Sequence, residues 1–224
     1  MSVLYGVSVG PGDPELMTIK AINTIKKCDI IVFPGKEISE AVAYNIAVQM
    51  VPELADKILL PIEMPMSKDK NVIDLAHKRA VALIEKQLVL GKNVAFLVLG
   101  DATIFSTFMY LEEYVKELGY DTEIISGVTS FCASAAKVGI SLCRWDENLV
   151  IVPSRHQLPK TFDDGKNYVL MKVGNCLAEL KKKLNASERK AVLIENCGME
   201  EERVYLELES FPDKTGYYSI VIVR

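Results

Sequence analysis

Residues 94–102 read Val-Ala-Phe-Leu-Val-Leu-Gly-Asp-Ala, an apolar run that ends in a glycine and a carboxylate. A strand buried on both faces of a parallel sheet has this continuous composition of Val, Leu and Phe. Ligands of open α/β sheets bind outside the carboxyl ends of such strands. The segment therefore predicts an α/β fold with a ligand site near Gly100 and Asp101.

The same pattern occurs at two other places in the chain. The apolar run 3–9 leads into Gly10-Pro11-Gly12-Asp13, and the run 122–125 leads into Ser126-Gly127-Val128-Thr129-Ser130. Three predicted strands thus end in glycine or small polar residues. We expect these ends to form one cleft that is lined largely by backbone atoms.

Strand and helix patterns alternate through the first half of the chain, which is typical of βα units and a parallel sheet. Two further strands are expected at 29–33 and 57–61. Apolar periodicity predicts helices over 18–27, 39–50, 71–90 and 106–118.

In the second half of the chain, strand-like segments follow one another more closely than in the first half. After a helical segment at 130–137, strand-like runs follow at 148–152, 167–171, 190–194, 203–207 and 217–223. Several of these runs are too close together for a crossover helix, which implies antiparallel pairing and a mixed sheet. We therefore expect two α/β domains, residues 1–126 with a mostly parallel sheet and residues 127–224 with a mixed sheet.

Composition narrows the classes of function. A net charge of −4 disfavours nucleic-acid binding, which requires a basic surface. The chain has no apolar run of the roughly 20 residues that span a bilayer, and its N-terminus lacks signal-peptide features. Five cysteines without a C-x-x-C pair indicate a reduced, cytoplasmic setting with mostly buried thiols.

The residues exclude several common chemistries. Glycines at 6, 10 and 12 do not form the G-x-G-x-x-G pattern of dinucleotide sites, and no G-x-x-x-x-G-K-[ST] phosphate loop occurs. The two histidines, His77 and His156, have neither metal-site nor triad spacing, so both are expected at the surface and no metal site is predicted.

Six motifs in order resemble the tetrapyrrole methylases, a family that uses S-adenosylmethionine. The first-loop and central motifs are V-S-V-G-P-G-D-P-E-L-M-T-I-K-A at 7–21 and G-D-A-T-I-F-S-T-F-M-Y-L at 100–111. The others are I-S-G-V-T-S-F-C-A-S-A-A at 125–136, Y-V-L-M-K at 168–172, I-E-N-C-G-M-E-E-E-R-V at 194–204 and Y-Y-S-I-V-I-V-R at 217–224. The tail of the central motif and the later segments are most similar to the branch that methylates carbon 20 of precorrin-2 or cobalt-factor II. The resemblance covers essentially the whole chain.

Two residues depart from the family pattern. Ala102 replaces the proline of G-D-P, and Ser126 replaces the proline of the P-G motif. Proline fixes φ, whereas Gly100 and Gly127 still allow a close approach of the backbone to a ligand. We expect a looser loop and a retained site.

The resemblance implies two α/β domains with S-adenosylmethionine in the cleft between them, in a homodimer. It implies cofactor contacts at Pro11, Leu99, Gly100, Asp101, Ile104, Thr129, Ser130, Met171 and Cys197, with Gly198 as the alternative to Cys197. Asp101 has the best physical case, because a carboxylate in a partly enclosed cleft can accept hydrogen bonds from the cofactor. A turn or helix-cap role remains the alternative for Asp101.

The remaining candidates are assigned from chemistry and position. Asp13 is the candidate catalytic base, although Asp13-Pro14 is equally a helix start and bound water could serve instead. A polycarboxylate substrate requires cations, and a macrocycle offers an apolar face to an aromatic ring. The candidate substrate-binding residues are Lys36, Tyr110, Arg144, Arg155 and Lys172, each with ordinary surface charge or core packing as the alternative.

The resemblance therefore predicts an S-adenosylmethionine-dependent C-methyltransferase of cobalamin (corrin ring) biosynthesis that acts on carbon 20 of cobalt-factor II or precorrin-2. The sequence does not decide whether the acceptor contains cobalt. Two alternatives remain open: a related tetrapyrrole methylase with another acceptor or carbon, including ribosomal RNA, and a non-catalytic tetrapyrrole-binding protein.

Overall fold

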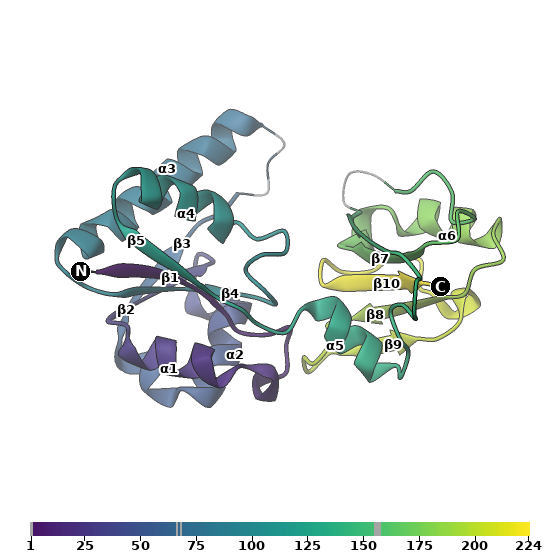
Figure 1. Ribbon diagram of the computed structural model, residues 1–224, viewed down its shortest axis with the longest axis horizontal. Helices are drawn as coiled ribbons and strands as arrows, with labels where there is room; N and C mark the ends of the chain where they lie inside the picture. Colours follow the sequence, from purple (N-terminus) through teal and green to yellow (C-terminus); the bar gives the residue numbers. More distant parts are fainter. Residues whose placement is uncertain (1, 66, 68, 155–157) are drawn as a thin grey trace. The chain divides into compact units, whose positions relative to one another are not determined.

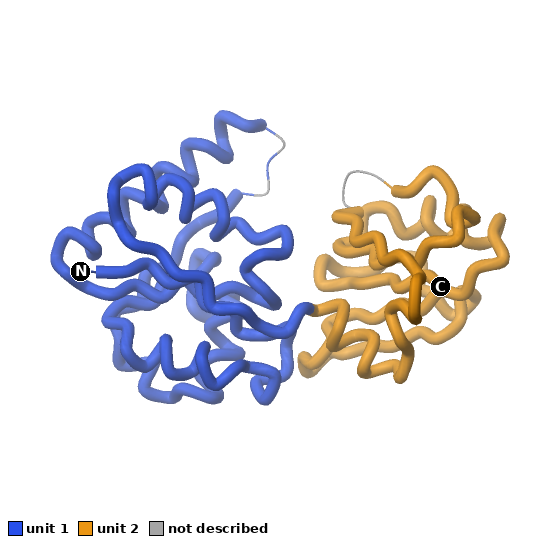
Figure 2. The backbone as a smooth tube through the Cα atoms, in the orientation of Figure 1, with its two compact units in different colours: residues 1–129 blue, residues 130–224 orange. Residues whose placement is uncertain are grey.

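The computed structural model describes residues 2–65, 67, 69–154 and 158–224. The chain divides into two compact units, Met1–Thr129 and Ser130–Arg224, which are coloured separately in Figure 2. The sequence predicts a boundary after residue 126, three residues before the division between the two units. Arg155 and His156 lie outside the described residues.

Unit 1 contains a five-stranded sheet in the order β3-β2-β4-β1-β5, with every pair parallel. The strands are β1 (Val3–Ser8), β2 (Ile30–Pro34), β3 (Ile58–Ile62), β4 (Val94–Val98) and β5 (Asp121–Ile125). All five residues of β4 are buried, as its continuous apolar composition predicts. Because the strands are parallel, their carboxyl ends lie at one edge of the sheet.

Helices cover both faces of this sheet (Figure 1). The helices are α1 (Ile19–Lys27), α2 (Val42–Met50), α3 (Lys70–Val89) and α4 (Phe108–Glu117), with 3-10 helices η1 (Pro14–Leu16), η2 (Ile38–Glu40) and η3 (Pro52–Asp56). Helices α1 and α2 bury residues such as Ile25 and Ile46 in one core, and α3 and α4 bury Ile84 and Leu111 in a second core on the opposite face. This is the doubly covered sheet expected from the alternating pattern.

Unit 2 contains a mixed sheet in the order β6-β7-β10-β8-β9. Only β6 and β7 pair in parallel, and the other three pairs are antiparallel. The elements are β6 (Leu149–Pro153), β7 (Asn167–Met171), β8 (Ala191–Glu195), β9 (Arg203–Tyr205), β10 (Ser219–Val223), α5 (Ser130–Lys137), α6 (Leu177–Asn185), η4 (Val173–Asn175) and η5 (Leu208–Ser210). The predicted mixed sheet is confirmed.

The two helices of unit 2 lie on opposite faces of its sheet. Helix α6 buries Leu177, Leu180 and Leu184 against a core that includes Leu170 and Val221. Helix α5 contacts β10 from the other side (Figure 1). Because side chains alternate along a strand, odd and even positions of β10 face different helices.

Two sequence expectations are wrong. His77 is not a surface residue: its side chain is buried beneath α4 and stacks on Tyr110, with ring centroids 5.5 Å apart. Burial lowers the pKa of His77, because the charged form loses hydration. Of the cysteines only Cys28 is buried, whereas Cys132 and Cys143 are exposed.

No helix within the described part of the chain is long and apolar enough to cross a membrane.

Candidate cofactor and substrate site

Backbone hydrogen bonds join the first two strand-end loops at the carboxyl edge of the unit 1 sheet. Gly10, just after β1, and Gly100, just after β4, form an isolated antiparallel bridge. The N–H of Gly100 donates to the Gly10 carbonyl at 2.7 Å, and the N–H of Gly10 donates to the Gly100 carbonyl at 3.3 Å. Both glycines have positive φ, 77° and 76°, a conformation that strains other residues.

Asp101, in the loop after β4, connects that loop to the loop after β5. Its Oδ2 accepts a hydrogen bond from the N–H of Gly127 at 2.7 Å, after β5. Its Oδ1 accepts from the N–H and the hydroxyl of Thr103, at 2.8 and 2.5 Å. Asp101 therefore connects the ends of β4 and β5, and both of its carboxylate oxygens already have protein partners.

These hydrogen bonds determine the charge of Asp101. Burial alone would raise the pKa of the Asp101 carboxyl, but the N–H of Gly127 and the hydroxyl and N–H of Thr103 outweigh burial and lower it. The carboxylate is thus a fixed negative charge at the sheet edge.

Ser8 supplies a second link between β1 and β4. Its side chain is fully buried, and its Oγ accepts a hydrogen bond from the N–H of Ala102 at 2.9 Å. A proline at position 102 has no N–H to donate. Ala102, which replaces the proline of the family pattern, is therefore held by a backbone hydrogen bond to Ser8 that a proline could not donate.

Gly127 allows the loop after β5 to approach Ser8 and Gly100 closely. A Cβ built on Gly127 would lie 2.5 Å from the Cβ of Ser8 and 2.7 Å from the Gly100 carbonyl oxygen. Only a residue without a side chain fits there. The three strand-end loops that the sequence predicted to lie together are thus joined, and backbone atoms dominate their contacts.

Thr129 provides an observation that points to a ligand. Its Oγ1 is buried and has no hydrogen-bond partner among the residues that the structure describes. A buried hydroxyl without a partner is costly, so a polar ligand atom would satisfy it. The donors and acceptors of the glycine backbone, the threonine hydroxyl and the negative charge of the carboxylate fit a small ligand with amino, hydroxyl and carboxylate groups.

The other predicted cofactor residues of unit 1 lie on the same loops. Pro11 is buried in the first loop, and Leu99 and Ile104 are half-buried on either side of Asp101. Phe105 follows with φ of 48°, a positive value for a residue with a side chain. Such strained residues occur preferentially at ligand sites.

The predicted cofactor residues of unit 2 lie toward one end of its sheet and at the start of α5. Met171 ends β7 and pairs with Ile220, near the start of β10. Cys197 is half-buried in the loop after β8, and the N–H of the neighbouring Gly198 donates to Glu202 Oε2 at 2.8 Å. Ser130 is the first residue of α5.

Glu195 supports this end of the unit 2 sheet. The buried carboxylate at the end of β8 accepts hydrogen bonds from the hydroxyls of Tyr205 and Thr215 and from the N–H of Gly216. It thereby fixes the 215–216 turn, whose carbonyl oxygens lie within 3 Å of a Cβ built on Gly174.

The structure places Lys36 at the sheet edge of the predicted cofactor loops, Lys172 next to Met171 in sequence, and Tyr110 on α4. Lys36 follows β2 at the carboxyl edge of unit 1 and pairs with Glu63 at 3.1 Å. Lys172 follows Met171 with φ of 62°, and its ammonium lies 5.3 Å from the centroid of Tyr217. Tyr110, in the first turn of α4, is 58% exposed rather than packed in the core.

The other two candidates are elsewhere. Arg144 lies in the loop between α5 and β6 and lines a pocket with Asn167, the first residue of β7. Met171 is the last residue of β7, so Arg144 is at the opposite end of that strand. Arg155 is outside the described residues.

Asp13 has a capping role. Its Oδ1 accepts a hydrogen bond from the N–H of Glu15 at 2.9 Å, which caps η1. Within the described residues, no group of three or more His, Cys, Asp or Glu side chains is arranged to hold a metal ion.

Sequence reasoning missed Ser8 and Thr103, the two hydroxyls that hold the Ala102 and Asp101 segment in place. The available signal for Ser8 was a polar residue inside an otherwise apolar run, between Val7 and Val9. A threonine two residues after an aspartate is common in turns, so Thr103 did not stand out in the sequence. Its hydrogen bonds to Asp101 could not be identified without the structure.

Comparison with known proteins shows similarity along nearly the whole chain. Residues 3–211 match the family model for tetrapyrrole (corrin/porphyrin) methylases. The chain is 33% identical over 99% of its length to a probable cobalt-precorrin-2 C(20)-methyltransferase of Methanocaldococcus jannaschii, covering 95% of that protein. It is 27% identical over 98% of its length to a precorrin-2 C(20)-methyltransferase of Sinorhizobium, covering 94% of it.

A solved structure supports the fold. The uroporphyrin-III C-methyltransferase of Thermus thermophilus, in complex with S-adenosylhomocysteine, superimposes with a TM-score of 0.72 at 19% identity, covering 100% of this chain and 97% of that one. The shared fold, together with the family match over most of the sequence, identifies the group. The chain belongs to the tetrapyrrole (corrin/porphyrin) methylase family, a family of methyltransferases.

Proposed function

We propose that this protein methylates carbon 20 of precorrin-2 or its cobalt-containing counterpart, with S-adenosylmethionine as the methyl donor. The observation that carries the proposal is the match over nearly the full chain to two relatives that are named as C(20)-methyltransferases. The carboxyl edge of unit 1 adds a physical reason, because it presents to a small polar ligand backbone groups and the Thr129 hydroxyl, which has no hydrogen-bond partner in the described part of the chain.

The cofactor residues are proposed from both units. In unit 1, the loops joined by Asp101 would hold the polar parts of S-adenosylmethionine through backbone N–H and carbonyl groups and Thr129 Oγ1. In unit 2, Met171 would provide an apolar, polarizable contact, and the Cys197 loop a further backbone contact. Asp101 would act mainly by positioning, since both of its oxygens already accept hydrogen bonds from the protein.

When bound, S-adenosylmethionine supplies an electrophilic methyl group on a sulfonium sulfur. The residues around it need to hold the donor against an electron-rich carbon of the macrocycle and to exclude water. Loops fixed by the Gly10–Gly100 bridge and the Ser8–Ala102 bond are suited to that task, because little rearrangement is needed on binding. Asp13 stays a candidate proton acceptor through Oδ2, since Oδ1 caps η1.

Cations near these loops are proposed to bind the carboxylates of the macrocycle. Lys172 is half-buried beside Met171, and Lys36 lies at the same sheet edge as Asp101. Tyr110 presents an exposed ring that could meet the apolar face of the macrocycle. We further propose a homodimer in the cytoplasm, on the basis of the family resemblance and of the cysteine pattern respectively.

Two alternative functions remain to be separated from this one. A methylase with another acceptor or carbon would transfer methyl groups to a different substrate, and the acidic net charge of −4 disfavours RNA. A non-catalytic tetrapyrrole carrier would bind the macrocycle and have little affinity for S-adenosylmethionine.

The test uses two anaerobic reactions of the purified protein with S-adenosylmethionine, one with cobalt-factor II and one with metal-free precorrin-2. Mass spectrometry of both products follows. We expect the mass of one methyl group to be added to at least one acceptor, and the faster acceptor identifies the cobalt state. No transfer to either acceptor by a protein that binds S-adenosylhomocysteine would contradict the proposal.

A further inference from the structure

A pocket of about 550 Å³ lies in unit 2, far along the sheet from the predicted cofactor residues. Its floor includes Val192 of β8 and Ile222 of β10, which are cross-strand partners. Arg144, Arg189, Lys190 and Arg224 line its sides. The volume is within the usual range of small-molecule sites, roughly 300–1,000 Å³.

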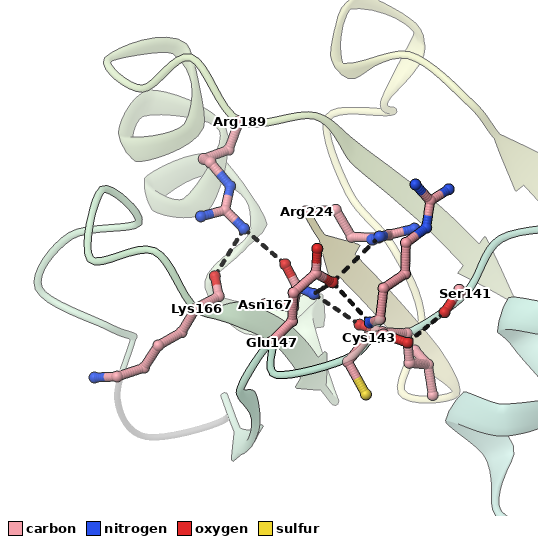
Figure 3. Close-up of polar contacts among 9 residues, drawn as sticks. Ser141, Cys143, Glu147, Lys166, Asn167, Arg189 and Arg224 are labelled. Carbon is pink, nitrogen blue, oxygen red and sulfur yellow. Dashed lines mark hydrogen bonds and ion pairs between the residues drawn. The ribbon is translucent and has the colours of Figure 1, made fainter.

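A buried asparagine organises the polar side of this pocket (Figure 3). The Nδ2 of Asn167 donates to the Leu142 carbonyl at 3.0 Å and to Glu147 Oε2 at 2.9 Å. Its Oδ1 accepts from Arg189 at 3.0 Å. One buried side chain therefore fixes both the loop before β6 and the arginine before β8.

Four cationic side chains line the pocket, against the two carboxylate side chains of Glu147 and Glu207. Glu147 Oε2 accepts from the Arg144 backbone N–H at 2.9 Å and lies 3.4 Å from an Arg224 nitrogen. The guanidinium of Arg189 donates only to neutral oxygens, those of Phe162, Lys166 and Asn167. Its charge therefore has no carboxylate partner within the described part of the chain.

Three further polar groups of the pocket lining have no hydrogen-bond or ion-pair partner among the described residues: one buried guanidinium nitrogen and two exposed cationic side chains. The Nε of Arg224 is buried and has no hydrogen-bond partner among the described residues. The side chains of Arg144 and Lys190 are exposed and form neither a salt bridge nor a hydrogen bond with any residue that the structure describes. Glu207, the second carboxylate of the pocket, is exposed to solvent.

The pocket is separate from the predicted cofactor residues of unit 2. Asn167 and Met171 are the first and last residues of β7, and four strand steps of about 3.3 Å put them roughly 13 Å apart. Strand β10 runs antiparallel, so Arg224 follows the end of that strand, on the Asn167 side. Met171 and Cys197 lie on the other side.

We propose that this pocket binds a small anion with two or more carboxylate or phosphate groups, with room beside them for an apolar part. Arginine guanidinium groups match the planar carboxylate and the phosphate geometrically, and the Val192 and Ile222 floor accepts the apolar part. Such a site goes beyond methyl transfer and does not depend on the identity of the methyl acceptor.

The experiment is an NMR titration of the ¹⁵N-labelled protein with citrate and, separately, with pyrophosphate, against sodium chloride at equal ionic strength. We expect saturable shifts of the Asn167 side-chain amide and of the backbone amides of Arg144 and Lys190, without a shift at Met171. A response to citrate alone assigns a carboxylate ligand, and a response to pyrophosphate alone assigns a phosphate ligand.

A charge variant and a matched control complete the test. Arg144→Gln combined with Lys190→Gln should weaken binding at least tenfold, whereas Lys182→Gln, an exposed cation on α6, should leave it unchanged. The proposal is wrong if neither anion gives saturable shifts, if chloride gives the same shifts, if the shifts centre on Met171, or if Lys182→Gln weakens binding equally.

Discussion

Single hydroxyl and carboxylate groups hold the predicted cofactor loops of unit 1. Ser8 accepts the N–H of Ala102 inside the protein, and Asp101 accepts three hydrogen bonds from Thr103 and Gly127. Neither residue needs to contact a ligand to affect ligand binding, because each fixes the backbone segment that is proposed to contact it. Their removal should therefore affect stability and ligand binding together.

Ser8→Ala should lower the free energy of unfolding by about 1–3 kcal/mol, because it leaves the buried N–H of Ala102 without an acceptor. Urea denaturation of the two proteins measures the difference. Ser126→Ala, at an exposed position, is the matched control and should have little effect. Equal stability of Ser8→Ala and the wild type would show that the bond is unimportant.

Asp101→Asn should destabilise the protein by about 1–3 kcal/mol at pH 7, because an amide cannot accept hydrogen bonds at both positions. Asp121→Asn, at an exposed position that starts β5, is the control. A loss of stability in the control as large as that in Asp101→Asn would contradict a specific role for Asp101.

The difference in stability between the wild type and Asp101→Asn should depend on pH, because the folded protein lowers the pKa of Asp101. The folded pKa is below the unfolded value of about 3.9, so the stabilisation is complete above about pH 4 and is lost as pH falls through the folded pKa. Unfolding measured between about pH 3 and pH 6 should show the gap between wild type and Asp101→Asn narrowing at the acid end. A gap that widens there would overturn this account.

At the scale of elements, the carboxyl ends of β1, β4 and β5 form one unit because their loops are in direct contact. Gly127 has too little space for a side chain, with 2.5 Å between a built Cβ and the Cβ of Ser8. Gly127→Ala should cost about 1–3 kcal/mol through overpacking and should weaken binding of S-adenosylhomocysteine, measured by calorimetry. Gly216→Ala, with no atom within 4 Å of its built Cβ, is the control.

Elements with strong apolar patterns could be predicted from the sequence. The expected strand at 167–171 and helix at 130–137 coincide with β7 and α5, because continuous burial or helical periodicity defines them. The expected helix at 39–50 is divided into η2 and α2, since its first residues pack little against the core. His77 was misplaced because its burial depends on Tyr110, a contact between helices that no local pattern contains.

The candidate site was predicted in part for the same reason. Glycine and carboxylate at strand ends indicated which loops carry the site, and the parallel sheet brings those loops to one edge. The partners of Asp101 were not predictable, because hydrogen bonds from Gly127 depend on the order of strands in the sheet. In unit 2, Asn167 and Arg189 are distant in sequence and gave no motif.

At the scale of the whole molecule, ligand binding should stabilise the folded chain. S-adenosylhomocysteine at about 100 times its dissociation constant should raise the free energy of unfolding by about 2.7 kcal/mol. A thermal unfolding series at increasing ligand concentration measures this rise, with adenosine at the same concentrations as the control ligand. A melting temperature that does not change with S-adenosylhomocysteine would indicate a protein without the cofactor site.

The central claim is the position of the transferred methyl group. The most direct measurement is ¹³C NMR of the product formed anaerobically from precorrin-2, or from cobalt-factor II, with S-adenosylmethionine labelled in its methyl carbon. The account predicts a single new methyl signal from a methyl group bonded to carbon 20 of the macrocycle. A labelled methyl group at any other carbon would contradict it.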